Sequence, residues 1–131
     1  MDVVLVDTSV WVNYFKAKET EASLFLKHNL SNIIIATCPV ILQEVLQGVV
    51  SDKEFSQVNS YLNRLLPLMG DSYEFAYDSA KLYRELRKNG VTIRKPNDCL
   101  IATYAMYYKV ALLQDDRDFQ LIAQHSDLKL I

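Results

Sequence analysis

The chain has 131 residues, half of them hydrophobic, with two cysteines and a formal net charge of -2. This length supports one packed core but hardly two, so we expect residues 1–131 to form a single domain. The slightly negative charge excludes a protein that coats nucleic acid by bulk electrostatics, and any contact with nucleic acid must be local.

The first segment has the pattern of a buried strand that leads into a helix. Residues 2–7, DVVLVD, form a short β-branched run that ends in cap-forming residues. The run is too short for a signal peptide and lacks a preceding basic region, and no other apolar stretch approaches membrane-spanning length. We therefore expect neither a signal peptide nor a contact with membrane.

Further short apolar runs alternate with segments of helical spacing. Strands are expected at 33–36, 111–113 and 128–131, with a weaker candidate at 65–69. Helices are expected at 9–16, 20–30, 39–47, 52–64, 72–89 and 97–109, with a short one near 117–124. Pro39 suits a first helical position, and Gly48 and Gly90 suit helix ends. The alternation predicts an α/β fold, with a mainly parallel central sheet flanked by helices on both faces.

The cysteines and histidines offer no chemistry of their own. Cys38 and Cys99 lie in apolar surroundings without C-x-x-C spacing, so we expect buried reduced thiols and a cytoplasmic protein rather than a disulfide or a zinc site. His28 and His125 have no partner at metal or acid–base spacing, so we expect surface or packing residues.

Acidic residues follow two of the expected strands. Asp7 comes directly after the first strand, and Asp115 and Asp116 follow the strand at 111–113. Because the carboxyl ends of parallel strands share one edge of the sheet, these side chains should project together. Taken singly, each has a simpler explanation: Asp7 is a good helix N-cap, and the acids at 115, 116 and 118 suit a solvated turn before a helix.

Two further acids are ambiguous from the residues alone. Asp98 opens a helix that is apolar nearly all round, where a carboxylate serves equally well as a dipole-stabilising residue or as part of a site. Glu44 lies between Gln43 and Gln47 in a polar strip that is typical of a solvent-facing edge. If several of these acids meet, their repulsion requires a cation, and oxygen ligands alone favour Mg²⁺ or Mn²⁺.

Four segments, in order and over nearly the whole chain, carry a wider pattern: DTSVWV at 7–12, PVILQEVLQG at 39–48, RKPNDCLIA at 94–102 and LLQDDRDF at 112–119. They resemble PIN domains, and most of all the VapC-type toxins of type II (VapBC) toxin–antitoxin systems. The resemblance implies a metal-dependent endoribonuclease that cuts structured RNA, such as tRNA or rRNA, to arrest translation. It also implies a homodimer that a small VapB-type antitoxin neutralises.

The same resemblance implies a catalytic, metal-binding quartet of Asp7, Glu44, Asp98 and Asp116. Asp118 also matches an acidic position of the pattern, and Asp116 is preferred because it lies nearer the strand end. Ser9 and Thr8 match the small hydroxyl positions after the first acid, where they would support the ligands by hydrogen bonds. Gln114 departs from the threonine often found at its position.

Basic and aromatic residues are the candidates for contacts with partners. Arg94 and Lys95 stand just before Asp98, and with Arg87 they are the expected phosphate contacts. A solvated helix face is the simpler explanation for the other basic residues of that region, Lys81, Arg84 and Lys88. The aromatic residues have helical spacing and are expected in the core or at a dimer contact: Trp11, Phe15, Tyr104, Tyr107 and Tyr108.

Two other functions compete with ribonuclease activity. One is a PIN-like module that binds RNA or protein without cutting, which the retention of all four acids disfavours. The other is a doubly wound phosphotransfer domain with a nucleophilic Asp7. That class has D-x-D after its first strand, whereas position 9 of this chain is Ser.

Overall fold

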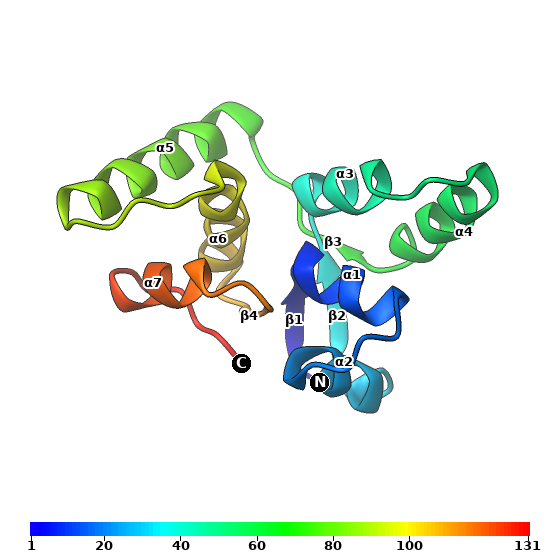
Figure 1. The fold of residues 1–131 in the computed structure, drawn as a ribbon. Helices are drawn as coiled ribbons and strands as arrows, with labels where there is room; N and C mark the ends of the chain where they lie inside the picture. Colours follow the sequence, from blue (N-terminus) through cyan, green and yellow to red (C-terminus); the bar gives the residue numbers. More distant parts are fainter.

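The computed structural model describes all of residues 1–131 and places four parallel strands at the centre of an α/β fold (Figure 1). The strands are β1 (Val3–Val6), β2 (Ile34–Thr37), β3 (Leu66–Pro67) and β4 (Ala111–Leu113), in the spatial order β3-β2-β1-β4. The sheet is parallel throughout, as the alternation of strands and helices predicts. The weak candidate at 65–69 contributes only the two residues of β3.

Both faces of the central strand β1 are covered. Its consecutive residues Val4, Leu5 and Val6 are all buried, although successive side chains of a strand point to opposite faces. In Figure 1, α5, α6 and α7 lie together to the left of the strands, α3 and α4 lie to the upper right, and α1 and α2 lie in front of and below β1 and β2. The predicted covering of both faces is therefore confirmed.

Seven helices connect the strands, and all of them start and end within about two residues of the predicted positions. They are α1 (Thr8–Phe15), α2 (Glu21–Asn29), α3 (Pro39–Gln47), α4 (Asp52–Leu62), α5 (Ser72–Lys88), α6 (Pro96–Tyr108) and α7 (Asp118–Gln124). Side-chain caps fix several starts: the side chains of Asp7, Thr20, Ser51 and Asp71 each accept a backbone N–H of the first turn. Pro39 and Pro96 begin α3 and α6, where the missing N–H costs nothing.

The strand predicted at 128–131 is wrong. The C-terminal segment makes a single parallel bridge, between Leu112 and Leu130. Two hydrogen bonds hold it there: the Leu112 N–H donates to the Lys129 carbonyl, and the Ile131 N–H donates to the Leu112 carbonyl. β4 has only three residues, and the chain must first turn back after α7, so too few residues remain for a paired strand.

One hydrophobic core joins the two groups of helices through the sheet. Its largest fully buried side chains are Trp11, Phe75 and Phe119. Trp11 and Tyr104 are core residues, as predicted, whereas Phe15, Tyr107 and Tyr108 are exposed on the surface. No helix combines the length and the apolar character needed to cross a membrane.

The order of the strands fixes where a site can form. From β1 the chain adds β2 and then β3 on one side, and it returns through α5 and α6 to place β4 on the other side of β1. The carboxyl end of β1 therefore lies at the point where the strand order reverses, which is the usual place for a site in a parallel sheet.

Candidate metal centre

Four carboxylates from four different elements line one cavity of about 320 Å³ at the carboxyl edge of the sheet. Asp7 follows β1, Asp116 follows β4, Glu44 lies on α3, and Asp98 lies in the first turn of α6. The remaining lining residues are Thr8, Ser9, Val12, Asn13 and Lys95. The structure thus brings together the whole predicted quartet and both predicted hydroxyl residues.

Asp7 is held both as a helix cap and as part of this cavity. Its backbone N–H donates to the Leu113 carbonyl of β4 at 2.9 Å, which ties the end of β1 to its neighbour. Its Oδ2 accepts the Ser9 backbone N–H at 3.0 Å and the Ser9 hydroxyl at 2.5 Å. Burial raises the pKa of Asp7 despite these hydrogen bonds, and the charge of Glu44 raises it further. The cap does not exclude a second role for the carboxylate.

Glu44 lines the cavity and is half-buried. Because α3 starts at Pro39, directly after β2, its second turn stands over the carboxyl edge of the sheet. The Glu44 Oε1 accepts the Thr8 hydroxyl at 2.7 Å, and Oε2 accepts the Asn97 amide at 3.4 Å. Its sequence neighbour Gln43 is exposed, whereas Glu44 is half-buried. The interpretation of Glu44 as part of a solvent-facing strip is therefore wrong.

Asp98 is the most confined of the four acids. Its side chain is 3 % exposed, and its Oδ2 is buried without a hydrogen-bond partner. Burial, followed by the charge of Asp116 and a hydrogen bond to that carboxyl, raises the pKa of Asp98 to about 8, and the charge of Asp7 adds to the shift. A buried acceptor without a partner costs free energy, which a ligand to that oxygen would recover.

Asp116 and Asp118 are close together but have different surroundings. Asp116 lines the cavity, and its Oδ2 accepts Lys95 Nζ at 3.4 Å, while its Oδ1 accepts the Asp118 backbone N–H at 3.0 Å. Burial raises the pKa of Asp116, but the hydrogen bonds from Asp118 and Asp98 and the charge of Lys95 outweigh burial and lower it. Asp118 instead accepts three N–H groups of Arg94, from the backbone, Nε and Nη2, at 3.2, 3.2 and 3.4 Å.

The donor set fits a hard divalent cation. One oxygen from each of Asp98, Asp116 and Asp118 lies within 4.8 Å of the others, and no cysteine or histidine belongs to the group. Carboxylate oxygens without nitrogen or sulfur ligands suit Mg²⁺ or Mn²⁺. The raised pKa values of Asp7 and Asp98 and the unpartnered Asp98 Oδ2 are the features that a cation would relieve.

The predicted phosphate contacts lie at different distances from the cavity. Lys95 is part of its lining, whereas Arg94 is 62 % exposed beside it and pairs with Asp118 and, at 3.6 Å, with Asp116 Oδ1. Arg87 is on the last turn of α5, with its guanidinium 5.7 Å from the centre of the Tyr83 ring. It is not part of the cavity lining.

The histidines and cysteines lie outside the cavity. His28 and His125 are exposed. Cys38 and Cys99 are free and buried, as predicted, and burial raises the pKa of their thiols to about 12 and about 11. Neither thiol is therefore reactive near neutral pH.

The amides of Asn13 and Asn97 were not identified as site residues from the sequence, nor was the hydrogen bond that Asp115 accepts from Asn13. Asn13 lines the cavity, and its Nδ2 donates to Asp115 Oδ2 at 2.9 Å. Asn97 contacts Glu44. Asn13 follows Ser9 by four residues on one helix, and this spacing would have placed it on the same face. The contacts of Asn97 and Asp115 are tertiary, and no local sequence pattern predicts them.

Comparison with known proteins identifies the fold. Residues 4–124 match the family described as the PIN domain. Ribonuclease VapC11 of Mycobacterium tuberculosis (strain ATCC 25618 / H37Rv) and VapC ribonuclease Mb1587 of Mycobacterium bovis are each 35 % identical to the chain over 130 residues. Each alignment covers 97 % of this chain and 96 % of the relative.

Solved structures of lower identity share the same fold. VapBC2 from Rickettsia felis, bound to a DNA fragment from its promoter, has a TM-score of 0.76 at 21 % identity, over 98 % of this chain and 97 % of that one. VapBC-1 from nontypeable Haemophilus influenzae has a TM-score of 0.74 at 18 % identity, over 98 % and 96 %. With a PIN match over most of its length and relatives above 30 % identity, the chain belongs to the VapC group of the PIN-domain family.

Proposed function

We propose that this protein is a VapC-type endoribonuclease toxin, which hydrolyses phosphodiester bonds in structured RNA with the help of Mg²⁺ or Mn²⁺. The observation that carries the proposal is the convergence of four carboxylates in one cavity, with an unpartnered buried oxygen on Asp98. The relatives at 35 % identity are named ribonucleases, which supports the same activity.

Asp7, Glu44, Asp98 and Asp116 would hold the cation. When bound, it would supply Lewis acidity that activates water for attack on phosphorus and offsets the negative charge of the departing oxygen. This chemistry leaves a 5′-phosphate and a 3′-hydroxyl, and no side chain forms a covalent bond to the RNA. One Asp118 oxygen lies within 4.8 Å of oxygens of Asp98 and Asp116, but Asp118 does not line the cavity. We place it outside the quartet because its carboxylate already accepts three N–H groups of Arg94.

The surrounding residues orient the acids. Ser9 directs its hydroxyl proton to Asp7 Oδ2, and Thr8 directs its own to Glu44 Oε1. Asp7 Oδ1 then remains for the cavity, and Glu44 Oε2 accepts only the 3.4 Å contact from Asn97. The Asp98 carboxyl, with a pKa of about 8, is protonated at neutral pH, and a bound cation would favour its ionised form. Lys95 at the rim would meet the phosphate of the incoming strand.

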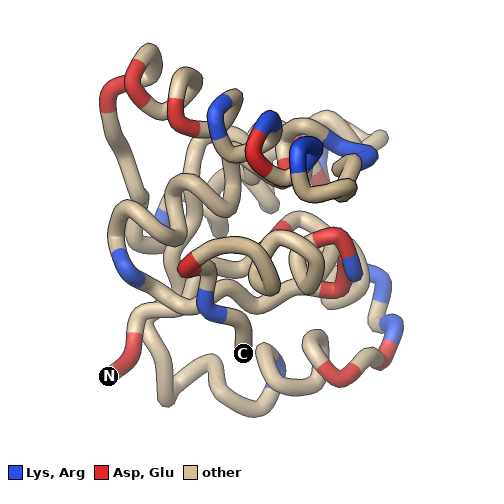
Figure 2. Tube along the Cα trace, turned by 90° about the vertical axis from the view of Figure 1, so that its left-hand side faces the viewer, with Lys and Arg blue, Asp and Glu red and all other residues tan.

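Arg87, Arg94 and Lys95 are the proposed contacts with the RNA backbone. Figure 2 shows acidic positions in the first half of the uppermost helix, α5, and basic positions in its C-terminal half, where Glu85 lies among them. The mixture of signs favours a few separate phosphate contacts over a continuous basic track, in keeping with the formal net charge of -2.

The toxin proposal includes partners. Several structural neighbours are VapBC complexes, two of them bound to DNA, and one is described as a toxin–antitoxin complex from Klebsiella pneumoniae. By analogy, a small VapB-type antitoxin would neutralise this protein, which would act as a homodimer in the cytoplasm and arrest translation. The two free, buried thiols are consistent with a reducing compartment.

Cleavage of a structured RNA by the purified protein tests the activity. We expect cleavage with Mg²⁺ or Mn²⁺, none with EDTA, and a loss of at least about 100-fold in Asp7→Ala and Asp98→Asn. Asp127→Asn, which removes an exposed acid outside the cavity lining, is the matched control. Undiminished cleavage in EDTA, or full activity of both site variants, would exclude the mechanism.

Two outcomes separate the competing functions. RNA binding by the wild type without cleavage in either metal would favour the non-catalytic module. Growth arrest upon expression, relieved by Asp98→Asn, is expected of a toxin, whereas arrest that persists in Asp98→Asn would separate the toxicity from nuclease activity.

A further inference from the structure

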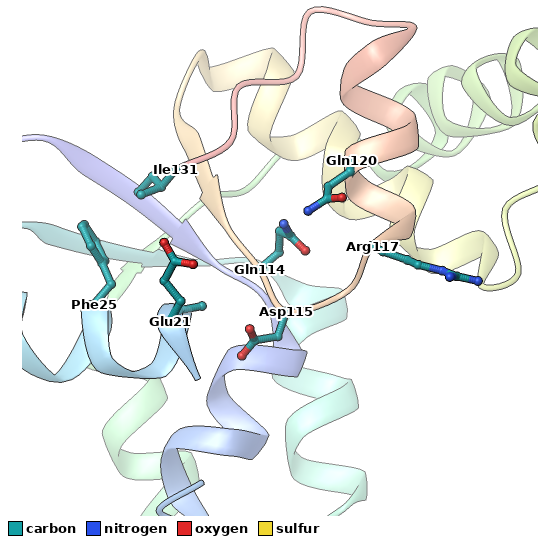
Figure 3. Close-up of a pocket in the computed structure, with 8 residues that line it drawn as sticks. Glu21, Phe25, Gln114, Asp115, Arg117, Gln120 and Ile131 are labelled. Atoms are coloured by element: carbon teal, nitrogen blue, oxygen red, sulfur yellow. The ribbon is translucent and has the colours of Figure 1, made fainter. Parts of the chain in front are cut away.

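A second hollow of about 380 Å³ adjoins the acidic cavity, between α2 and α7 (Figure 3). Its lining comprises Glu21, Ala22, Phe25, Gln114, Asp115, Arg117, Gln120 and Ile131. The volume is within the range of small-molecule sites, about 300–1,000 Å³. None of its polar groups belongs to the proposed catalytic quartet.

The two hollows share one wall. Asn13 lines the acidic cavity and Asp115 lines the second hollow, and the Asn13 Nδ2 donates to Asp115 Oδ2 at 2.9 Å. Thr20 donates to the same oxygen at 2.7 Å, and the Asp115 N–H donates to the Ser9 hydroxyl at 2.9 Å. Asp116, the next residue along the chain, lines the acidic cavity, so the two hollows are close enough for neighbouring nucleotides of one strand to reach both.

The polar groups of the hollow are arranged with acceptors opposite donors. Gln114 Oε1 accepts the Asp116 N–H at 2.7 Å, which fixes the orientation of this carboxamide and leaves its NH₂ group as a free donor. Figure 3 shows the Glu21 carboxylate on one side of Gln114 and the Gln120 carboxamide on the other. Asn13 and Thr20 both donate to Asp115 Oδ2, which leaves only Oδ1 of that carboxylate, whereas both oxygens of Glu21 are available to accept as a pair.

Guanine is the one RNA base whose Watson–Crick edge offers a hydrogen bond to both oxygens of a carboxylate. Guanine presents two adjacent donors, N1–H and the N2 amino group, which a carboxylate accepts as a pair, and its O6 beside them accepts from an amide NH₂. Adenine and cytosine present an acceptor next to their amino group, which a carboxylate repels, and uracil has a single N–H between two carbonyls. Phe25 and Ile131 supply the apolar wall against which a base plane can lie.

We propose that this hollow binds a guanine next to, or one nucleotide removed from, the scissile phosphate, with Glu21 accepting from N1 and N2 and Gln114 donating to O6. The inference rests on the proposed ribonuclease function for its place in catalysis. The binding of the base itself requires neither cleavage nor a metal ion.

Binding is tested by NMR titration of the protein in EDTA with the four 5′-ribonucleoside monophosphates. We expect GMP to shift the backbone amides of Glu21, Gln114 and Gln120, and to bind about tenfold or more tightly than AMP, CMP or UMP. Glu21→Gln should weaken GMP binding by about the same factor. Glu19→Gln, which removes the same charge two residues earlier and outside the hollow, should leave it unchanged. Gln120→Leu provides a second variant within the hollow and should also weaken binding.

Sequencing of the cut ends from a hairpin RNA with a randomised loop tests the role in cleavage. Guanine should be enriched at one position within two nucleotides of the cut by the wild type and by Glu19→Gln, and not by Glu21→Gln. Equal binding of the four nucleotides, shifts confined to other amides, or enrichment of another base would overturn the proposal. No cleavage of the pool together with selective GMP binding would instead contradict the ribonuclease function and leave the base site standing.

Discussion

At the scale of single residues, the surroundings of Asp98 predict a dependence of stability on pH. The pKa of this carboxyl is about 8 in the folded protein against an ordinary 3.8, so between these values the folded state binds a proton that the unfolded state has lost. The free energy of unfolding must then fall as pH rises through this window. Asp116 has a lowered pKa, so its contribution changes only below about pH 4, in a separate window.

Asp98→Asn should remove this dependence, because an amide resembles the protonated carboxyl. In metal-free buffer we expect the variant to be more stable than the wild type at about pH 8, by about 1–3 kcal/mol, and similar to it at about pH 4. Urea unfolding at several pH values measures the difference, with Asp127→Asn as the control. Parallel curves for the wild type and Asp98→Asn would show that the shift is absent.

Ser9 is expected to act through Asp7. Ser9→Ala removes the 2.5 Å hydrogen bond to Asp7 Oδ2 and the acceptor of the Asp115 N–H. The Mn²⁺ concentration that gives half-maximal cleavage should rise about 10- to 100-fold. Ser60→Ala, on the exposed face of α4, should behave as the wild type. An unchanged Mn²⁺ requirement in Ser9→Ala would assign Ser9 to helix capping alone.

The site residues differ in how far the sequence predicts them. Asp7 and Asp116 follow from their places after β1 and β4, because the ends of parallel strands share an edge. Glu44 depends on the orientation of α3 and on Thr8, which are tertiary features, and only the family resemblance selects it. The separate surroundings of Asp116 and Asp118 depend on the side chain of Arg94, which no spacing predicts.

At the scale of elements, helix and strand positions are the best-predicted feature because their signals are local. Pro39 and the capping residues mark where helices begin, and apolar periodicity marks their length. The error at 128–131 arises because the apolar run LKLI matches a strand, while pairing depends on how many residues β4 offers. Sheet length is thus set by the partner and not by the run itself.

Two glycines at helix ends should respond in opposite ways to alanine. Gly90 follows α5 with φ of +81°, a conformation that costs an alanine about 1 kcal/mol, so Gly90→Ala should destabilise the protein by that amount. Gly48 caps α3 with φ of -86°, and an added Cβ would lie 3.6 Å from its nearest neighbour. Gly48→Ala should therefore be neutral or stabilise by about 0.4–1 kcal/mol. Thermal unfolding of the two variants distinguishes them, and equal effects would contradict the difference in backbone geometry.

At the scale of the whole molecule, acids and bases are divided between the cavity and its rim. The formal net charge is -2, and the cavity itself concentrates four carboxylates, so RNA affinity must come from a few cations around it. Lys95 stands at the rim, Arg94 is beside it, and Arg87 is on α5. A protein with so few phosphate contacts should show a shallow dependence of affinity on salt.

The slope of RNA affinity against salt tests this division of charge. In the non-cleaving Asp98→Asn background, the logarithm of the association constant should fall linearly with the logarithm of salt concentration. Three contacts, at about 0.7 for each single-stranded phosphate, predict a slope of about -2. Lys95→Gln and Arg87→Gln should each reduce the magnitude of the slope by about 0.7, whereas Lys53→Gln, on α4, should not. Arg94→Gln should in addition destabilise the fold, because it leaves the buried Asp118 carboxylate without its ion pair. A slope steeper than about -3 would mean that further cations, such as Lys81, Arg84 and Lys88 of α5, also bind the RNA.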